Sequence, residues 1–451
     1  MTQKSYTLAA VLISSFICPF MASAMTVAVP AIAVEFGVPA VQMSWLLTAF
    51  LLGSACVLLP FGRLADLRGR KRVFLWGLSG VFVTSLLCGA SVSAEMLIFV
   101  RFLQGIVISM IFSTGIAILV SSHRPEERGK VLGISVSFTY AGISTGPFLG
   151  GAIAEFFGWR MIFFVTAVVV FASWYLGSKV VDEWYGEKGG QMDLRGSFFY
   201  AVSMLCILYG ISVFETQPLA VWIVVVGAIF GAVFLWEQMA SEHPLIQLSL
   251  FRNVTFSMSN LAALLHYSAT FAISFLLSLY LELLHGFTES QAGAVLLLQP
   301  LMMAALSAWA GSLSDKVQPR IVASFGMGLT TMGLAFLSGI GMATPVWQVG
   351  IILVLIGIGF AFFSSPNSNA IMGAVHPSQM GVATSIFSVM RVLGQGMSMA
   401  MVTLLLNRYV LSATGGGYLA SLEAGIQQIF FLFTFICLAG TAISVMRGKG
   451  E

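Results

Sequence analysis

The chain has 451 residues, of which 58% are hydrophobic and only 9% are charged, and its mean hydropathy is +0.96. A typical soluble domain carries about 25% charged residues, so this chain has too little polar surface for a soluble enzyme and is too apolar for a disordered protein. Its formal net charge of +3 is too small for a nucleic-acid-binding face.

Apolar segments long enough to cross a bilayer occupy nearly the whole sequence. A spanning helix needs roughly 20 apolar residues. The first run continues past a plausible cleavage site to Pro30, so we interpret it as a retained span and not as a signal peptide. We expect an all-α membrane protein with fourteen spans, at about 6–29, 43–61, 73–93, 96–120, 131–155, 160–179, 196–214, 219–238, 254–283, 291–311, 321–342, 346–371, 380–406 and 425–446.

The Lys and Arg residues predict the orientation of these spans. With the N-terminus in the cytoplasm, all but four of them fall in cytoplasmic loops or tails, as the positive-inside rule requires. Arg101 and Arg391 lie within spans, and Arg160 and Arg408 fall on the outer side. An even number of spans then places both termini in the cytoplasm.

One pattern, G-x-x-x-D, occurs twice at a predicted cytoplasmic joint. It begins at Gly62 after the second span and at Gly311 after the tenth, with Asp66 and Asp315 as its acidic residues. The two copies of the pattern are eight spans apart, which equals the six spans of one repeat plus an inserted pair of spans. We therefore predict two six-helix bundles, 1–194 and 239–451, on either side of a transmembrane hairpin, 195–238, whose turn is 215–218. Two related halves with a site between them are typical of an alternating-access transporter.

Three motifs resemble those of the major facilitator superfamily. The segment 62–72 matches G-x-x-x-D-x-x-G-[RK]-x-[RK], segment 101–105 matches R-x-x-Q-G, and segment 142–151 matches the G-x-x-x-G-P-x-x-G-G motif of the family's antiporters. Together with the fourteen spans they resemble the drug:proton antiporter branch. The motif residues are Gly62, Asp66, Gly69, Arg70 and Arg72; Arg101 and Gln104; and Gly142, Gly146, Pro147, Gly150 and Gly151.

The resemblance implies a multi-pass protein of the cell membrane that moves small molecules and protons. It implies no cofactor, no metal, no nucleic-acid partner and a monomeric state. The five cysteines lie in apolar runs without a CxxC pair, which favours packing roles for them.

The first and third motifs suggest gating. Asp66, and Asp315 in the repeat, could pair with basic residues or cap a helix N-terminus in one state and release it in the other; alternatively the loop is a solvated topology anchor. The glycines of 142–151 lie on one helix face, and Pro147 would bend that helix. This face lets a neighbouring helix approach closely, whether for gating or only for packing.

Proton coupling departs from the family pattern. The branch has an acidic residue in the first span, where this chain has Met21. The candidates that remain are His266, the side chain type that titrates near neutral pH, and Glu282, both assisted by Arg101. His266 could instead make a helix–helix hydrogen bond, and Arg101 could extend to the outer interface. Gln104 and Arg391 are further candidates, and other carboxylates near outer ends are Glu35, Glu95, Glu155, Glu215, Glu289 and Glu423.

We expect a proton-coupled exporter of hydrophobic or amphipathic compounds. The alternative is a dedicated metabolite exporter or an uptake porter of the same fold. A membrane enzyme is disfavoured because the sequence has no metal cluster, no paired intramembrane carboxylates and no nucleophile–base arrangement. A channel is disfavoured because repeated halves suit alternating access.

Overall fold

The computed structural model describes residues 3–38, 45–187, 190–214, 217, 219–410 and 418–447, without the side chains of 289–290, 407–410 and 418. Within these ranges the chain forms helices and no strand. The helices are α1 (Gln3–Phe36), α3 (Trp45–Ala55), α4 (Leu58–Arg68), α5 (Arg70–Gly89), α6 (Ala94–Ser122), η1 (Pro125–Glu127), α7 (Arg128–Phe157), α8 (Arg160–Ser178), α9 (Leu194–Ser212), α10 (Ala220–Ala240), η2 (Leu248–Arg252), α11 (Val254–Thr270), α12 (Ile273–Leu279), η3 (Tyr280–Leu284), α13 (Glu289–Leu296), α14 (Leu298–Ser314), α15 (Pro319–Leu337), α16 (Val346–Gly373), η4 (Pro377–Gln379), α17 (Met380–Val410) and α18 (Tyr418–Met446).

Long apolar runs form these helices, and short polar residues begin several of them. Ser93, Asp193 and Asn253 each accept a hydrogen bond from a backbone N–H in the first turn of the helix that follows, and Thr288 forms a capping box with Gln291. Such caps satisfy N–H groups that a helix leaves unpaired, which is necessary next to a bilayer.

Twelve helical segments in the described ranges are long and apolar enough to span a bilayer, and α3 with α4, bent by 44°, makes a thirteenth. The sequence predicted fourteen. The predicted span that does not meet the criterion is α7, which has 30 residues but is rich in glycine, serine and threonine. These small polar residues lower its mean hydropathy.

The predicted loop 62–72 is helical in the structure. Helix α4 continues to Arg68 and α5 begins at Arg70, so only Gly69 separates them. Gly69 has a φ of 105°, which favours glycine. Asp66 therefore lies on a helix and not in a solvated loop.

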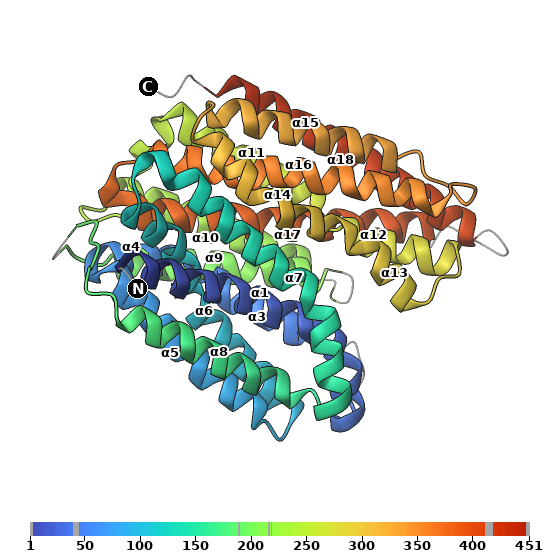
Figure 1. The fold of residues 1–451 in the computed structure, drawn as a ribbon, viewed down its shortest axis with the longest axis horizontal. Helices are drawn as coiled ribbons and strands as arrows, with labels where there is room; N and C mark the ends of the chain where they lie inside the picture. Colours follow the sequence, from blue (N-terminus) through green and yellow to red (C-terminus); the bar gives the residue numbers. More distant parts are fainter. Residues whose placement is uncertain are drawn as a thin grey trace.

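The helices form two groups. The first group is α1 to α8, and one buried apolar cluster lies entirely within it. The second group is α11 to α18, whose larger cluster also includes residues of α4, α6, α7, α9 and α10. Helices α4 and α14 end, and helices α7 and α17 begin, at one end of the molecule. We call this end the Asp66 end. The two groups meet at that end, on the left of Figure 1, and diverge toward the other.

Both ends of the described chain lie at the Asp66 end. Lys4, in the first turn of α1, forms an ion pair with Glu127, which directly precedes α7. Arg320, in the first turn of α15, donates to the carbonyl of Arg447, just beyond α18. The path of the chain therefore starts and finishes on the same side.

The helices α9 and α10 form a hairpin beside the two groups. Of its turn, 215–218, only Gln217 is among the described residues. The Tyr200 hydroxyl donates to the Ala55 carbonyl of α3 at 2.8 Å, and Leu208 packs against α3 and against Val392 of α17. Helix α9 thus contacts both groups.

The glycine motif of α7 faces α1. A Cβ at Gly142 would overlap the Phe16 carbonyl, and one at Gly146 would lie 2.6 Å from Ser23 Cβ. Because Pro147 has no N–H, the Ile143 carbonyl loses its helical partner, and it accepts instead from the Ser23 hydroxyl at 2.9 Å. The small residues therefore permit contact between the backbones of α1 and α7.

This packing predicts the effect of Gly146→Leu. The added side chain has no space between α7 and α1, so we expect a loss of stability of about 1–3 kcal/mol or more and little folded protein. Gly151→Leu is the matched control, because a Cβ there meets only Val27 Cγ1, at 3.6 Å. Thermal unfolding in detergent measures the difference. Equal midpoints for the two variants would contradict the packing described here.

Candidate gating and transport site

Asp66 is fully buried at the end of α4 and is held by a cation one turn further along the chain. Arg70, 1% exposed, donates from Nε at 2.9 Å and from a terminal nitrogen at 2.7 Å to one carboxylate oxygen. The same guanidinium donates to the Ser121 hydroxyl at 2.8 Å. A buried carboxylate needs such compensation because its desolvation is costly.

The Asp66 carboxylate also joins the two groups. It accepts the backbone N–H of Gly381 at 3.1 Å and that of Val382 at 3.0 Å, in the first turn of α17. Arg70 donates in addition to the Pro377 carbonyl at 2.6 Å. A carboxylate at a helix N-terminus is favoured by the free N–H groups and by the helix dipole. We call this contact the Asp66 joint.

Close backbone approach makes the Asp66 joint possible. A Cβ at Gly62 would lie 2.7 Å from the Gly381 carbonyl oxygen, and a Cβ at Gly381 would lie 2.6 Å from the Asp66 carboxylate. Only glycine fits at either position. The first and fifth residues of the G-x-x-x-D motif are thus one turn apart and act on the same partner helix.

A second joint repeats this geometry between the other pair of helices. Asp315, at the end of α14, accepts the N–H of Gly129 at 2.6 Å and that of Lys130 at 2.8 Å, in the first turn of α7. A Cβ at Gly311 would overlap the Gly129 carbonyl. We call this contact the Asp315 joint.

The two joints differ in charge compensation. Within the described residues Asp315 has no ion pair, and its side-chain partner is the Asn369 amide at 3.5 Å. Burial raises the pKa of Asp315 above its ordinary value, although the N–H groups of Lys130 and Gly129 lower it. Among the described residues, the Asp315 joint therefore has no cation comparable to Arg70 of the Asp66 joint.

The expected type of partner, a helix N-terminus, is present for both aspartates. Sequence reasoning did not identify which helices these are, although a signal for them exists. Each partner helix follows a short 3-10 turn, in the pattern P-x-x-x-G: Pro125 to Gly129 and Pro377 to Gly381. The spacing puts a glycine in the first turn of α7 and of α17. The two P-x-x-x-G patterns are a second internal repeat, which pairs with the G-x-x-x-D repeat.

The segment 180–187, which follows α8, lies over the Asp66 joint. Glu183 accepts the Lys71 N–H at 2.8 Å, Glu187 forms an ion pair with Arg63 at 2.8 Å, and the N–H of Gly186 donates to the Asp66 carbonyl at 2.8 Å. Burial raises the pKa of Glu183, while Lys71 lowers it. The segment therefore covers the joint on the Asp66 end. Lys188 of this linker lies outside the described residues, and Arg72 is exposed.

Arg101 lies inside the first group and makes neither of the contacts expected from the sequence. It is fully buried and donates to Gln104 at 2.7 Å and to the Leu46 carbonyl at 3.3 Å, with Phe50 beneath its guanidinium at 4.4 Å. Gln104 in turn donates to Ser85 at 2.9 Å. No described contact joins Arg101 to His266 or Glu282, and it does not extend to the surface. Its contacts indicate that the R-x-x-Q-G motif ties α3, α5 and α6 together.

His266 is fully buried in the second group, on α11. Its ring stacks on Phe363 with centroids 4.1 Å apart and meets Phe360 edge-on at 4.5 Å. Neither ring nitrogen has a hydrogen-bond partner within the described residues. The helix–helix hydrogen bond considered for this histidine is therefore absent from this state.

The other candidates lie apart from His266. Glu282 is half-buried in the π-helical turn η3 at the end opposite Asp66, where Ser278 donates to it. Met21, at the position of the usual acid, is fully buried in the core of the first group. Glu35 accepts from Trp159 and Arg160. Glu215 and the side chain of Glu289 lie outside the described residues.

Arg391 is the candidate that lies between the groups. It is half-buried on α17, and its guanidinium sits over the Phe112 ring of α6 at 5.5 Å. Close by, the Tyr140 ring of α7 meets Phe360 of α16 edge-on at 5.5 Å. Aromatic side chains from both groups therefore meet around one arginine.

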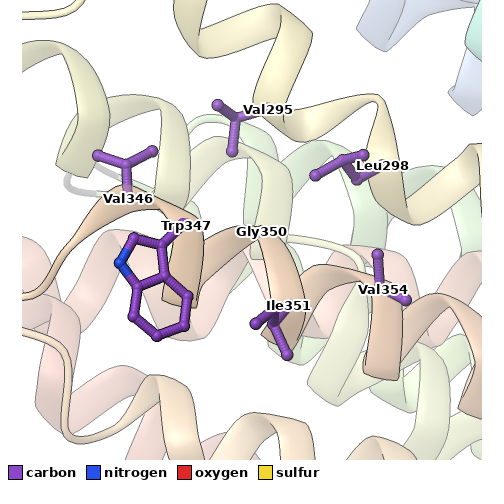
Figure 2. A pocket seen from close by; sticks show the side chains of 7 residues that line it. All are labelled: Val295, Leu298, Val346, Trp347, Gly350, Ile351 and Val354. Carbon is purple, nitrogen blue, oxygen red and sulfur yellow. The ribbon is translucent and has the colours of Figure 1, made fainter.

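A separate groove lies on the second group at the end opposite Asp66. It encloses about 400 Å³ and is lined by aliphatic residues and Trp347, as Figure 2 shows. Trp347 is 64% exposed and has no charged neighbour in this lining. Because a ligand site needs polar groups to orient its ligand, we interpret this groove as lipid-facing surface.

Comparison with known proteins identifies the family. The model of the Major Facilitator Superfamily matches residues 11–399. The chain belongs to this superfamily. It is therefore a membrane-embedded transporter for small molecules, and the joints described above lie between the two helix groups of a major facilitator fold.

Two curated relatives are similar to this chain in sequence, and one solved structure is similar to it in fold. The riboflavin transporter RibZ of Clostridioides difficile is 28% identical, over 99% of this chain and 98% of its own length. The multidrug resistance protein Stp of Mycobacterium tuberculosis is 28% identical, over 86% of this chain and 73% of its own. A bacterial homologue of the iron transporter ferroportin, in an outward-facing state with soaked iron, has a TM-score of 0.68 at 13% identity and covers 99% of both chains.

The unequal joints predict unequal effects of neutralisation. Asp66→Asn removes the partner of the buried Arg70, whereas Asp315→Asn leaves no buried cation unpaired. We expect Asp66→Asn to separate the groups at the Asp66 end far more than Asp315→Asn does. The measurement is the labelling rate of a single cysteine introduced at Ser364, in a cysteine-free background, by an impermeant maleimide added on the Asp66 side. Equal rates in the two variants would show that Arg70 contributes nothing to closure.

Proposed function

We propose that this transporter exports small amphipathic molecules in exchange for protons, by alternating access, as a monomer in the cell membrane. The observation that carries the proposal is the pair of Asp joints, which close the two groups at one end by contacts that can be released. Contacts of this kind suit an equilibrium between two states, because each is a small set of hydrogen bonds and not a packed core.

We infer that α7 is the fourteenth span. The described chain starts and finishes at the Asp66 end, which requires an even number of crossings, whereas hydropathy identifies thirteen. Helix α7, with 30 residues, is long enough to cross, and its polar small residues are covered by α1 and α14. Two six-helix halves, 1–194 and 239–451, would then flank the hairpin 195–238, with both termini in the cytoplasm.

The export direction rests on the glycine motif of α7 and on the multidrug resistance relative. The face of Gly142, Gly146, Gly150 and Gly151, with Pro147, would let α7 slide against α1 while the Asp315 joint opens and closes at its N-terminus. In this interpretation Gly62, Asp66, Gly69, Arg70, Arg72 and Asp315 are gating residues.

For proton coupling we favour His266 over Glu282. His266 lies 12 residues into α11, far from both ends of its span, and its ring nitrogens are free to take a proton once the groups separate. Glu282 is too close to the far end to be exposed alternately to the two sides. Because Arg101 is sealed inside the first group, we no longer assign it a part in this step.

A dedicated metabolite transporter is the second candidate. RibZ, named for riboflavin, aligns along nearly the full length of this chain. This observation favours one specific planar substrate over a broad range of drugs, without changing the transport mechanism.

Transport in proteoliposomes tests the proposal. An outward-directed substrate flux driven by an imposed pH gradient is expected for the wild type, with ethidium and riboflavin as probes for the two candidates. We expect His266→Gln to abolish the pH-driven component and to leave downhill exchange largely intact, because the substrate contacts remain. Glu282→Gln is the matched control and should keep the proton-driven flux. Full proton-driven flux in His266→Gln would place the coupling site elsewhere, and no response of the wild type to a pH gradient would refute antiport.

A further inference from the structure

The central depth of the membrane contains a cluster of rings from both helix groups. Phe112, Tyr140, His266 and Phe360 lie between 10 and 13 residues from the Asp66 end of their helices, as does Arg391. At 1.5 Å per residue this is about 15–20 Å, close to the midplane of a hydrocarbon core roughly 30 Å thick. We call these five residues the midplane cluster.

The rings of the midplane cluster contact each other across the boundary between the groups. Phe112 packs against the cores of both groups. Tyr140 of the first group meets Phe360 of the second, and its hydroxyl interacts with Ser364 and Tyr267. These contacts must break when the groups separate. A flat aromatic ring that enters between Tyr140 and Phe360 would replace the ring–ring contacts that these residues lose.

Arg391 gives this cluster an uncompensated positive charge. Its described interactions are with the Phe112 ring and, electrostatically, with Tyr140. No Asp or Glu in the described helices lies more than five residues from a helix end or break, so none reaches this depth. A charge at the membrane centre is costly and usually faces a partner or a functional site. Cation–π contact with one phenyl ring offsets only part of that cost.

Arg101, a second arginine within a span, is wholly enclosed by its own group and is not accessible to a ligand. It donates to the Gln104 side-chain oxygen and to the Leu46 carbonyl, and one of its terminal nitrogens has no partner within the described residues. Arg391, in contrast, is only partly buried, and its described contact is with the Phe112 ring and with no hydrogen-bond acceptor. Its guanidinium is therefore available to a ligand, and guanidinium groups match carboxylates in a two-point geometry.

We propose that the midplane cluster binds an aromatic anion, with the negative group on Arg391 and the ring among Phe112, Tyr140 and Phe360. This inference rests on the proposed transport function and adds a substrate class to it. At this cluster a cation of the same shape is disfavoured because Arg391 repels it and the described helices place no carboxylate at this depth. Met21, at the usual acidic position, is buried in the first core and supplies no charge either.

The test uses three probes that share a ring and differ in charge: 2-naphthoate, neutral 2-naphthamide and 2-naphthylmethylammonium. Binding to the full-length protein in nanodiscs is measured by calorimetry. We expect the naphthoate to bind about ten-fold more tightly than the ammonium. Arg391→Gln should remove this preference, and Arg391→Lys should keep it, because the charge remains. Thermal unfolding of both variants establishes that they are folded. If the glutamine variant is not folded, the comparison of naphthoate with the ammonium in the wild type decides the test.

The outcomes separate this inference from the proposed function. Equal or tighter binding of the ammonium, or a naphthoate preference that survives in folded Arg391→Gln, overturns the aromatic-anion site and assigns Arg391 to cation–π packing alone. If ethidium export driven by a pH gradient persists in that case, the exporter stands without this substrate class. If naphthoate binds as expected but no pH gradient moves any probe, the site stands and proton-coupled export fails.

Discussion

A buried carboxylate at the boundary between two helix groups is the interaction on which the closed end of this transporter depends. Asp66 is shielded from water, so it requires compensation, and it draws that compensation from both sides of the boundary. Arg70 belongs to its own group and the N-terminus of α17 to the other. Separation of the groups therefore removes part of the stabilisation of a charge and leaves the remainder intact. This division allows the contact to open without exposing a fully unpaired ion.

The Asp315 joint has the same geometry but less charge compensation. It uses the N-terminus of α7 and an amide in place of a guanidinium. In both joints the glycines allow the backbones to approach closely, so that a carboxylate lies within 3.1 Å of backbone N–H groups in another helix. Since each joint also fixes the start of a long helix that reaches the midplane, the arrangement of the rings around Arg391 depends on them.

The sequence predicted much of this and missed specific parts for physical reasons. Apolar length is a strong signal, and it located the ends of the long helices, α7 among them, to within about seven residues. In the structure α7 is nevertheless not among the helices apolar enough to span, because it is rich in glycine, serine and threonine. The motifs located Asp66 and Asp315. Their partners are backbone N–H groups, which have no side-chain signature, so only the P-x-x-x-G repeat could have revealed them. The placement of Arg101 could not be predicted, because spacing along one helix does not tell which neighbouring helix a side chain faces.

The position of the hairpin has a consequence for lipids. Helix α9 contacts α3 through Tyr200 and α17 through Leu208, so it covers the line along which those two helices approach each other. Acyl chains are therefore excluded from that side of the molecule in this state. No described helix covers the line between α7 and α14 in this way. These two helices approach closely at small residues such as Gly133, where an added Cβ would lie 2.9 Å from Ala308 Cα, and Leu132 and Met303 belong to one buried cluster there. A lipophilic molecule that arrives from within a leaflet thus meets one blocked flank and one flank whose width depends on the separation of the two groups.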